Sequence, residues 1–329
     1  MKRAGFTILE LLLVMALLGV ILGAGIGMFA GLDLGKSQAA GLVKNVLRSA
    51  QNSAILRQAP ACVRIDRAEG TMTPEAMKVI GTWHFENRSL DGAFDLGGGR
   101  ERGVEFTGAG FIGDALRFDG RPGSLVEFPI EHDPSWDFTA GFAIDVAVRK
   151  EVGAGGYVVT VGEIACIDVT GANAVRGWFV PTIYEKGVPQ PGGRVMVASA
   201  PGVMGDDWVR VRLEYDRSRL RLSVDGVPVA ELEEEAEVWK IDDPLVLSHR
   251  RHPFTGSVDN LVVSAVVVGD VAELPESVLF TADTPEEIHF DAGGRLDRDE
   301  HPEPVKIELE YEDGSRQAIW VGVYGTVEG

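Results

Sequence analysis

The stretch "WVRVRLEYDRSRLRLSVDGVPVAEL", residues 208–232, alternates apolar and polar side chains almost without interruption. A period of two is that of a β-strand, whose successive side chains point to opposite faces of a sheet. Asp225-Gly226 separates two of these runs, and this dipeptide favours the tight turn of a two-residue hairpin. The stretch therefore predicts antiparallel strands, with a hairpin over residues 221–232.

Similar short runs continue on both sides, from about residue 80 to residue 268. They include "DALRFDG" (114–120), "SLVEFP" (124–129), "FAIDVAVR" (142–149), "YVVTVG" (157–162) and "SVDNLVVS" (257–264). Many short strands at regular spacing are typical of a β-sandwich. We therefore expect residues 80–268 to form one sandwich of two sheets.

The chain has 329 residues, a formal net charge of −19 and two cysteines. Nucleic acid is not expected as a partner, because its phosphates need Lys and Arg side chains to neutralise them. Cys62 and Cys166 lie in neither a Cys-x-x-Cys pair nor a Cys/His cluster, so the sequence predicts no zinc site. Both are predicted to be free thiols, and a disulfide between them stays open because the chain is expected to be exported.

The N-terminal segment from Leu11 to Leu32 contains 22 residues and no charged side chain. A helix of that length can cross a hydrocarbon core of about 30 Å. Lys2 and Arg3 precede it, and positive residues stay cytoplasmic, so the bulk of the chain is expected outside the cytoplasm. A cleaved signal peptide ending near Ala24 is the alternative, but it gives no reason for the carboxylate of Glu10.

Gly5-Phe6-Thr7-Ile8-Leu9-Glu10, after a short basic leader, resembles the processing signal of type IV prepilins and type II secretion pseudopilins. The resemblance implies that prepilin peptidase cuts between Gly5 and Phe6 and that Phe6 is then N-methylated. It also makes Glu10 the acidic residue that serves assembly. The physics agrees, because a carboxylate in an apolar segment is costly unless it is paired, and cleavage creates an amine four residues away.

The helix is expected to continue to residue 58, because apolar side chains recur at helical spacing up to the helix breaker Pro60. These are Val43, Val46, Leu47, Ala50, Ala54 and Ile55. They predict an amphipathic half that packs against a globular head. At the other end, residues 286–297, 304–314 and 317–329 alternate as strands do. Their "IHFDAGGRL" and "WVGVYGTV" segments resemble the C-terminal strands of H-type minor pseudopilins.

The middle block resembles the concanavalin A-like, laminin-G-like jelly-roll family. The residues that carry the resemblance are 113–120, 138–148, 208–216, 222–226 and 254–260. The family implies a sandwich that binds sugars or proteins, in some members through calcium. Asp119, Asp259 and Asn260 have oxygen donors of the right kind, but each also suits a turn, so calcium stays open and the metal ligands unknown.

The expected fold class is α+β, with a jelly-roll inserted into a small pseudopilin head; a tandem arrangement is the alternative. The expected parts are a leader (1–5), a pilin-type helix (6–58, with 6–32 in the membrane), a β-head (59–79 and 269–329) and the jelly-roll (80–268). No cofactor is assigned with certainty. Trp136, Trp178 and Trp208 are expected in the sandwich core, and His249 and His252 in an exposed basic loop.

The sequence contains no Glu-x-Asp-x-Glu triplet of the glycosidase kind and no nucleophile motif. No catalytic residue is therefore assigned, and the protein is expected not to be an enzyme. The resemblances imply a prepilin-type subunit, a minor pseudopilin of type II secretion, in the bacterial inner membrane and a periplasmic pseudopilus. Its partners would be prepilin peptidase, other pseudopilins and the membrane. The alternative is a displayed lectin-like module that binds a carbohydrate or protein ligand.

Glu10→Ala is expected to leave cleavage and membrane insertion intact and to impair assembly, because the new amine of Phe6 loses its partner. Cross-linking of neighbouring subunits in membranes would measure assembly, and the size of the mature chain would measure cleavage. Normal cross-linking by the variant would show that the pairing account of Glu10 is wrong.

Overall fold

A computed structural model describes residues 34–90, 100–128, 136–240 and 243–329. Gly5, Phe6, Glu10 and the apolar segment 6–32 lie outside these residues. The helix α2 (Leu34–Arg57) and the short 3-10 helix η1 (Glu86–Arg88) are the helices of the described part, and all other regular structure is strand. In these residues no helix is both long and apolar enough to cross a membrane.

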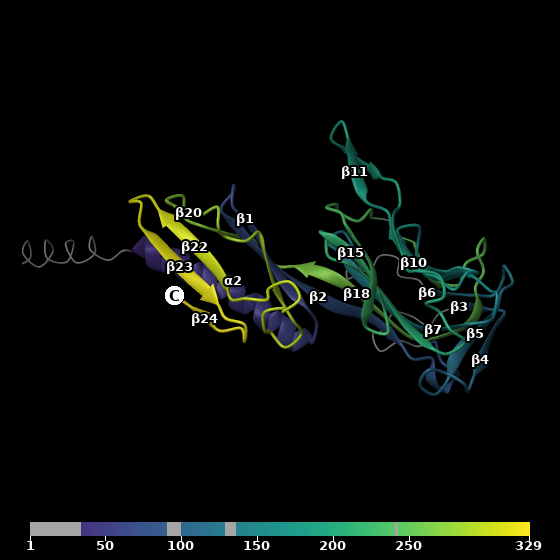
Figure 1. Cartoon of the computed structure of the whole chain (residues 1–329). Helices are drawn as coiled ribbons and strands as arrows, with labels where there is room; N and C mark the ends of the chain where they lie inside the picture. Colours follow the sequence, from purple (N-terminus) through teal and green to yellow (C-terminus); the bar gives the residue numbers. More distant parts are fainter. Residues whose placement is uncertain (1–33, 91–99, 129–135, 241–242) are drawn as a thin grey trace, which may run out of the picture.

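The strands form four antiparallel sheets (Figure 1). The largest runs in the order β16 (Val227–Glu233), β15 (Arg219–Val224), β14 (Val209–Tyr215), β7 (Phe142–Lys150), β18 (Thr255–Val268), β2 (Thr71–Trp83), β1 (Ala61–Asp66) and β21 (Glu287–Phe290). Beside this path, β5 (Ala115–Asp119) pairs with β18, and β4 (Val104–Thr107) pairs with β5. The short β19 (Ala272–Glu273) pairs with β2.

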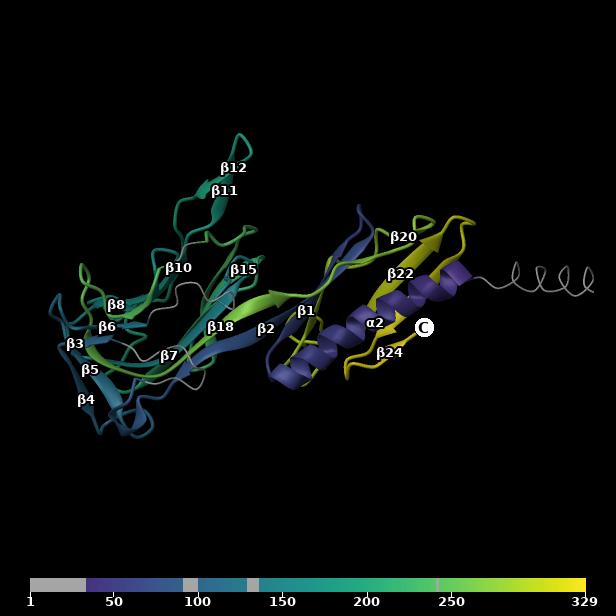
Figure 2. The same cartoon turned by 180° about the vertical axis from the view of Figure 1, so that it is seen from behind.

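The second sheet runs β13 (Val195–Ala198), β10 (Val175–Phe179), β9 (Ala165–Val169), β8 (Gly156–Val161), β17 (Leu245–Leu247), β6 (Leu125–Phe128) and β3 (Arg100–Arg102). A third pairs β11 (Thr182–Glu185) with β12 (Val188–Pro191) and projects from the sandwich (Figures 1 and 2). The fourth is β20 (Val278–Phe280), β22 (Val305–Tyr311), β23 (Arg316–Val321) and β24 (Val327–Glu328).

The first two sheets face each other and form the predicted sandwich. Phe118 and Phe142 of the large sheet share one buried core with Phe128 and Phe179 of the seven-stranded sheet. Full burial of each such aromatic side chain contributes about 1.5–3 kcal/mol. The predicted hairpin is confirmed: β15 and β16 pair at Val224 and Val227, and the two turn residues between them have the positive φ angles of this turn.

A smaller body holds a separate core between α2 and the strands β1, β2 and β21 to β23. Val43, Leu47 and Ala50 of α2 are buried there, as the helical spacing predicts. Ile55 is 51% exposed, so its predicted place in the buried face is wrong. The three predicted C-terminal strand regions are confirmed as β21, β22 and β23 with β24.

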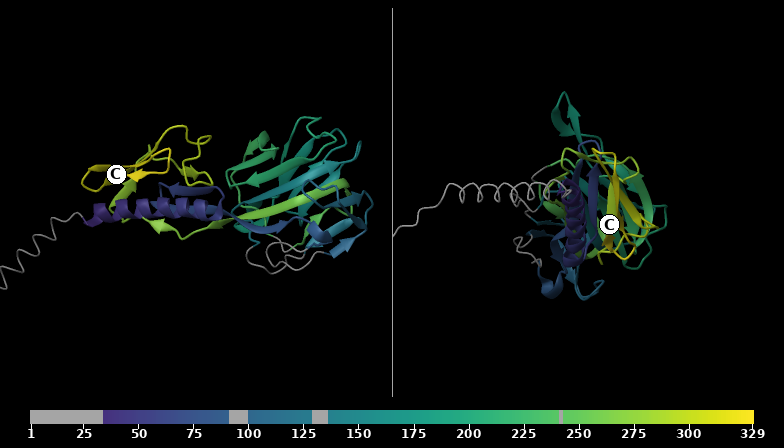
Figure 3. Two further views of the ribbon diagram at one scale, coloured as in Figure 1. Left: turned by 90° about the horizontal axis from the view of Figure 1, so that it is seen from below. Right: turned by 90° about the vertical axis from the view of Figure 1, so that its left-hand side faces the viewer.

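The two bodies lie end to end and are joined by β2 and β18, which pass from one to the other as a pair (Figure 3). On β2, Met72 and Ala76 belong to the smaller core, whereas Ile80 and Trp83 belong to the sandwich core. A β-bulge at Ile80 interrupts the β2–β18 register. Ile80 and Trp83 are three residues apart and would point to opposite faces of a regular strand. The extra residue at the bulge shifts the alternation by one, so both point into the sandwich core.

The expected α+β class is wrong. Strands make up 49% of the described residues and helix only 9%, so the chain is mostly β. The reason is that both bodies are built from strands, whereas the described helix is a single element of 24 residues on one side of the smaller body.

Gly256→Ala is expected to lower the free energy of unfolding by about 2–4 kcal/mol. Gly256 has a φ of 152°, and an added Cβ would lie 2.4 Å from the carbonyl oxygen of Arg149. Gly123→Ala is the matched control, because a Cβ there meets no atom within 4 Å. Urea unfolding of both variants measures the difference; equal midpoints would contradict the close strand approach at Gly256.

Candidate functional site

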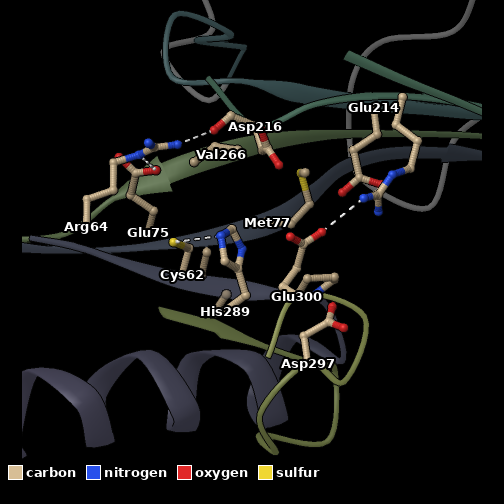
Figure 4. Close-up of a pocket in the computed structure, with 14 residues that line it drawn as sticks. Cys62, Arg64, Glu75, Met77, Glu214, Asp216, Val266, His289, Asp297 and Glu300 are labelled. Carbon is tan, nitrogen blue, oxygen red and sulfur yellow. Dashed lines mark hydrogen bonds and ion pairs between the residues drawn. The ribbon is translucent and has the colours of Figure 1, made fainter. Parts of the chain in front are cut away.

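Strand alternation gives β1 one apolar and one polar face. Ala61, Val63 and Ile65 are buried in the core beneath α2. Cys62 and Arg64 therefore point to the opposite face of the sheet. That face lies at the junction of the two bodies, where a cavity of about 140 Å³ opens between them (Figure 4).

Strand register places the partners of Cys62 and Arg64 on the same face of the sheet, in or beside this junction pocket. Cys62 lies opposite Glu75 on β2 and opposite His289 on β21, and Arg64 lies opposite Glu287 on β21. The rest of the lining comes from the sandwich strands and from the loop after β21. It includes Glu214, Asp216, Arg221, Asp297 and Glu300.

Arg64 connects three carboxyl or carbonyl groups from different elements. Its Nε lies 2.9 Å from Oε2 of Glu75, and its two Nη groups bind Glu287 and the backbone carbonyl of Asp216. Glu75 is only 4% exposed and also pairs with Arg217 at 3.3 Å. Burial opposes the charge of Arg64, but Glu75 and Glu287 outweigh it and raise its pKa above the usual range. Arg64 is therefore charged, and its bond to the backbone carbonyl of Asp216 links the smaller body to the sandwich.

A second ionic contact crosses the same junction. Arg219 and Arg221 of β15 lie 2.6 and 3.1 Å from Oε1 of Glu300, which belongs to the loop after β21. Burial opposes ionisation of Glu300, but the two arginines hold its pKa below the usual range. The sandwich and the smaller body are thus held together here by charged side chains.

Cys62, Glu287 and His289 form a compact cluster beside Arg64. The Sγ of Cys62 lies 3.9 Å from Nε2 of His289, and that same nitrogen lies 2.9 Å from Oε2 of Glu287. Burial opposes protonation of the ring, but the contacts with Cys62 and Glu287 raise the pKa of His289 to about 11. Burial raises the pKa of the Cys62 thiol. One donor atom from each of the three residues lies within 4.8 Å of the others, so the cluster could hold a metal ion.

The sequence did not predict this site. It predicted no Cys/His cluster, because His289 is distant from Cys62 in sequence. The usable signal was the alternation Cys62-x-Arg64 and Glu287-x-His289 in two strands. The processing and assembly residues Gly5, Phe6 and Glu10 lie outside the described part of the chain.

The oxygen donors considered for calcium are not brought together. Asp119 lies opposite Thr255, so Asp259 is four residues farther along β18. The carboxylate of Asp119 accepts the backbone N–H of Arg121, and that of Asp259 accepts the backbone N–H of Ile112. Asp119 thus serves a local turn, as the turn interpretation predicts. Asp259 instead lies inside β18 and binds a distant backbone group, so its predicted place in a turn is wrong.

A second side-chain cluster lies on the seven-stranded sheet. The Tyr157 ring packs against His252 at 4.6 Å and His249 at 5.3 Å. The Arg194 guanidinium lies 3.9 Å from the centre of the Trp178 ring. His252 and Arg194 are exposed, so this aromatic cluster reaches the surface.

Two of the three tryptophans expected in the core are buried, and both cysteines are free thiols as predicted. Trp136 and Trp178 are buried, whereas Trp208 is only half-buried. Cys62 and Cys166 are both free thiols; Cys166 is buried, and Cys62 is half-buried in the junction pocket.

Residues 1–26 match the family model described as "Prokaryotic N-terminal methylation motif". The N-terminus therefore carries a prepilin-type methylation motif. No curated protein matches the chain.

Solved structures that resemble the chain include the binding domain of Paraclostridial Mosquitocidal Protein 1, at 10% identity and a TM-score of 0.45. That match covers 56% of this chain and 48% of the other, so the chain spans about half of that protein. Another is domain 4 of AbnA, a GH43 extracellular arabinanase from Geobacillus stearothermophilus, in complex with arabinotriose. Its identity is 14%, its TM-score 0.40, and the match covers 57% of this chain and 93% of that one. Similarities at this level assign no function.

Arg64→Ala is expected to lower the free energy of unfolding by about 3–5 kcal/mol, because it leaves the buried carboxylate of Glu75 without its closest cation. Arg117→Ala is the matched control: Arg117 pairs with Glu151 at 2.9 Å, but both side chains are about half exposed. Chemical denaturation should show a lower midpoint for Arg64→Ala and an unchanged midpoint for Arg117→Ala. An unchanged midpoint for Arg64→Ala would mean that the ion pair does not stabilise the junction.

Proposed function

We propose that the chain is a prepilin-type subunit without enzymatic activity, specifically a minor pseudopilin of a type II secretion system. The observation that carries the proposal is the methylation motif matched over residues 1–26. Its Gly5-Phe6 pair would be the cleavage point for prepilin peptidase, and Phe6 the methylated terminus. The apolar segment 6–32 would hold the subunit in the bacterial inner membrane, with Lys2 and Arg3 on the cytoplasmic side.

Assembly would involve the N-terminal region as a whole. Glu10 would pair with the terminal amine of its own or a neighbouring subunit, and residues 6–32 would pack against other pseudopilins. The helix α2 supports this arrangement, because it begins at Leu34 directly after the apolar segment and buries one face in the smaller body. The periplasmic part would then follow the membrane segment directly in sequence.

We assign residues 59–79 and 269–329 to a pseudopilin-like head, and residues 80–268 to an inserted jelly-roll of the concanavalin A-like kind. The two separate cores support this division, since the residues of each fall almost wholly on one side of these boundaries. A head that carries so large an insertion stacks poorly on copies of itself. A minor or terminal position in the pseudopilus follows from this bulk.

N-terminal analysis of the protein purified from membranes tests the proposal. The expected mature terminus is N-methylated Phe6, and it should be lost when prepilin peptidase is removed. A Gly5→Ala variant is the matched control, because it should leave the leader in place. A mature N-terminus near residue 25 would instead show a secreted protein with an ordinary signal peptide.

The aromatic cluster favours a second candidate function, the binding of a carbohydrate by the sandwich. Tyr157 and His252 offer ring faces, and Arg194 offers a cation above Trp178. Aromatic faces stack on sugar rings, and guanidinium groups bind their carboxylates or hydroxyls. The N-terminal motif would then deliver a displayed binding module.

Deletion of residues 80–268 separates the two functions. A scaffold subunit predicts that secretion fails, whereas a binding module predicts that secretion continues and glycan binding is lost. In the full chain, Tyr157→Ala should abolish glycan-array signals, and Tyr184→Ala on the projecting hairpin is the control. Secretion that persists after the deletion would contradict the scaffold role of the insertion.

A further inference from the structure

The cluster of Cys62, Glu287 and His289 has a geometry that differs from a nucleophile activated by a base. In a catalytic Cys–His–acid arrangement the two ring nitrogens face different partners. Here the single Nε2 of His289 faces both Sγ of Cys62, at 3.9 Å, and Oε2 of Glu287, at 2.9 Å. Three donor atoms thus converge on one point instead of forming a relay.

We propose that these three residues bind a divalent metal ion of the zinc class at the junction of the two bodies. Thiolate, imidazole and carboxylate are the donors that Zn²⁺ takes in proteins. Tetrahedral zinc, with bonds of about 2.3 Å to sulfur and about 2.0–2.2 Å to nitrogen and oxygen, sets its donors about 3.3–3.6 Å apart. The observed separations of 3.9 and 2.9 Å differ from these by a few tenths of an ångström.

A neighbouring side chain already orients the carboxylate of one ligand, and the backbone of a second ligand is held in place. Arg64 binds Oε1 of Glu287, which leaves Oε2 to face the cluster. The backbone N–H of His289 donates to Nε2 of His301 at 3.0 Å, so that nitrogen of His301 is committed to the backbone. Partners of this kind hold the ligands of metal sites in place. Cys62 and His289 both line the junction pocket, so the cluster borders a cavity.

Two further observations favour this cluster over other parts of the described chain. Among the described residues, no other three His, Cys, Asp or Glu side chains bring their donor atoms within 4.8 Å of one another. His249 and His252 also approach each other, but Arg250 and Arg251 lie between them in sequence. Burial lowers the pKa of His249, and the nearby His252 and Arg251 lower it further. Cations around that pair oppose a metal ion.

The inference goes beyond a prepilin-type role and does not depend on it. The ion would join β1 to β21, two strands whose ligands are 227 residues apart in sequence. It would therefore fix the edge of the smaller body on which the sandwich rests. Because the unfolded chain holds no such site, bound metal should stabilise the folded protein.

The test uses the full chain in detergent, stripped with a chelator and then given Zn²⁺. One equivalent of zinc should remain after dialysis, and the unfolding temperature should rise. Zinc should also protect Cys62 from alkylation, mapped by mass spectrometry. Co²⁺ in place of zinc should give the near-ultraviolet charge-transfer absorption of a thiolate ligand.

Variants separate the proposed ligands from other metal-binding groups. Cys62→Ser and His289→Ala should each weaken zinc binding by about 100-fold or more, beyond the 10–100-fold typical of an outer partner. Cys166→Ser and His252→Ala are matched controls and should bind as the parent does. Cobalt absorption that persists in Cys62→Ser would overturn the assignment.

Alkylation of the parent protein decides the matter even where a variant fails to fold. Equal alkylation of Cys62 with and without zinc would overturn the proposal. In that case the short contact between His289 and Glu287 is a plain ion pair between an imidazolium and a carboxylate.

Discussion

The pairing of β2 with β18 is the constraint on which the rest of the molecule depends. One ladder of hydrogen bonds runs from Glu75 opposite Val268 to Trp83 opposite Leu261. The end near Glu75 borders the core of the smaller body, and the end near Trp83 lies in the core of the sandwich. Neither core can be assembled with its present boundary unless these two strands, far apart in sequence, take this register.

Charged side chains fill much of the remaining contact between the bodies, beside a small apolar cluster that includes Ala59, Met77 and Ala143. Arg64 links Glu75 to Glu287, and Arg219 and Arg221 share Glu300. Buried ion pairs of this kind add little net stability compared with apolar packing, but breaking one partner is costly. Their directional bonds fix how the smaller body sits against the sandwich, which the two paired strands alone would leave free to twist.

The sequence predicted the local features of the fold, because they depend on local patterns. Alternation identified the strands, Asp225-Gly226 identified a hairpin, and helical spacing identified the buried face of α2. Ile55 was misassigned although its neighbour Ala54 is fully buried. One residue turns a helix by about 100°, which takes Ile55 off the buried face. The class was misjudged because a 24-residue helix weighs little against so many strands.

The candidate site could not be predicted in the same way. Cys62 and His289 meet only because β1 and β21 pair in one register. A shift of one of these strands by one residue would turn its side chains to the opposite face. The bulge at Ile80 is equally invisible in the sequence, since it exists only relative to the partner strand. Register between distant strands is a property of the assembled sheet, and no local pattern encodes it.

Because β2 leaves the smaller body and β18 returns to it side by side, the sandwich is attached through one pair of neighbouring strands. Chain entry and exit are therefore already matched in spacing and direction. Any β-domain whose first and last strands pair antiparallel could occupy the same place without changing the core of the smaller body. The smaller body could therefore accept a different inserted β-domain at the same position.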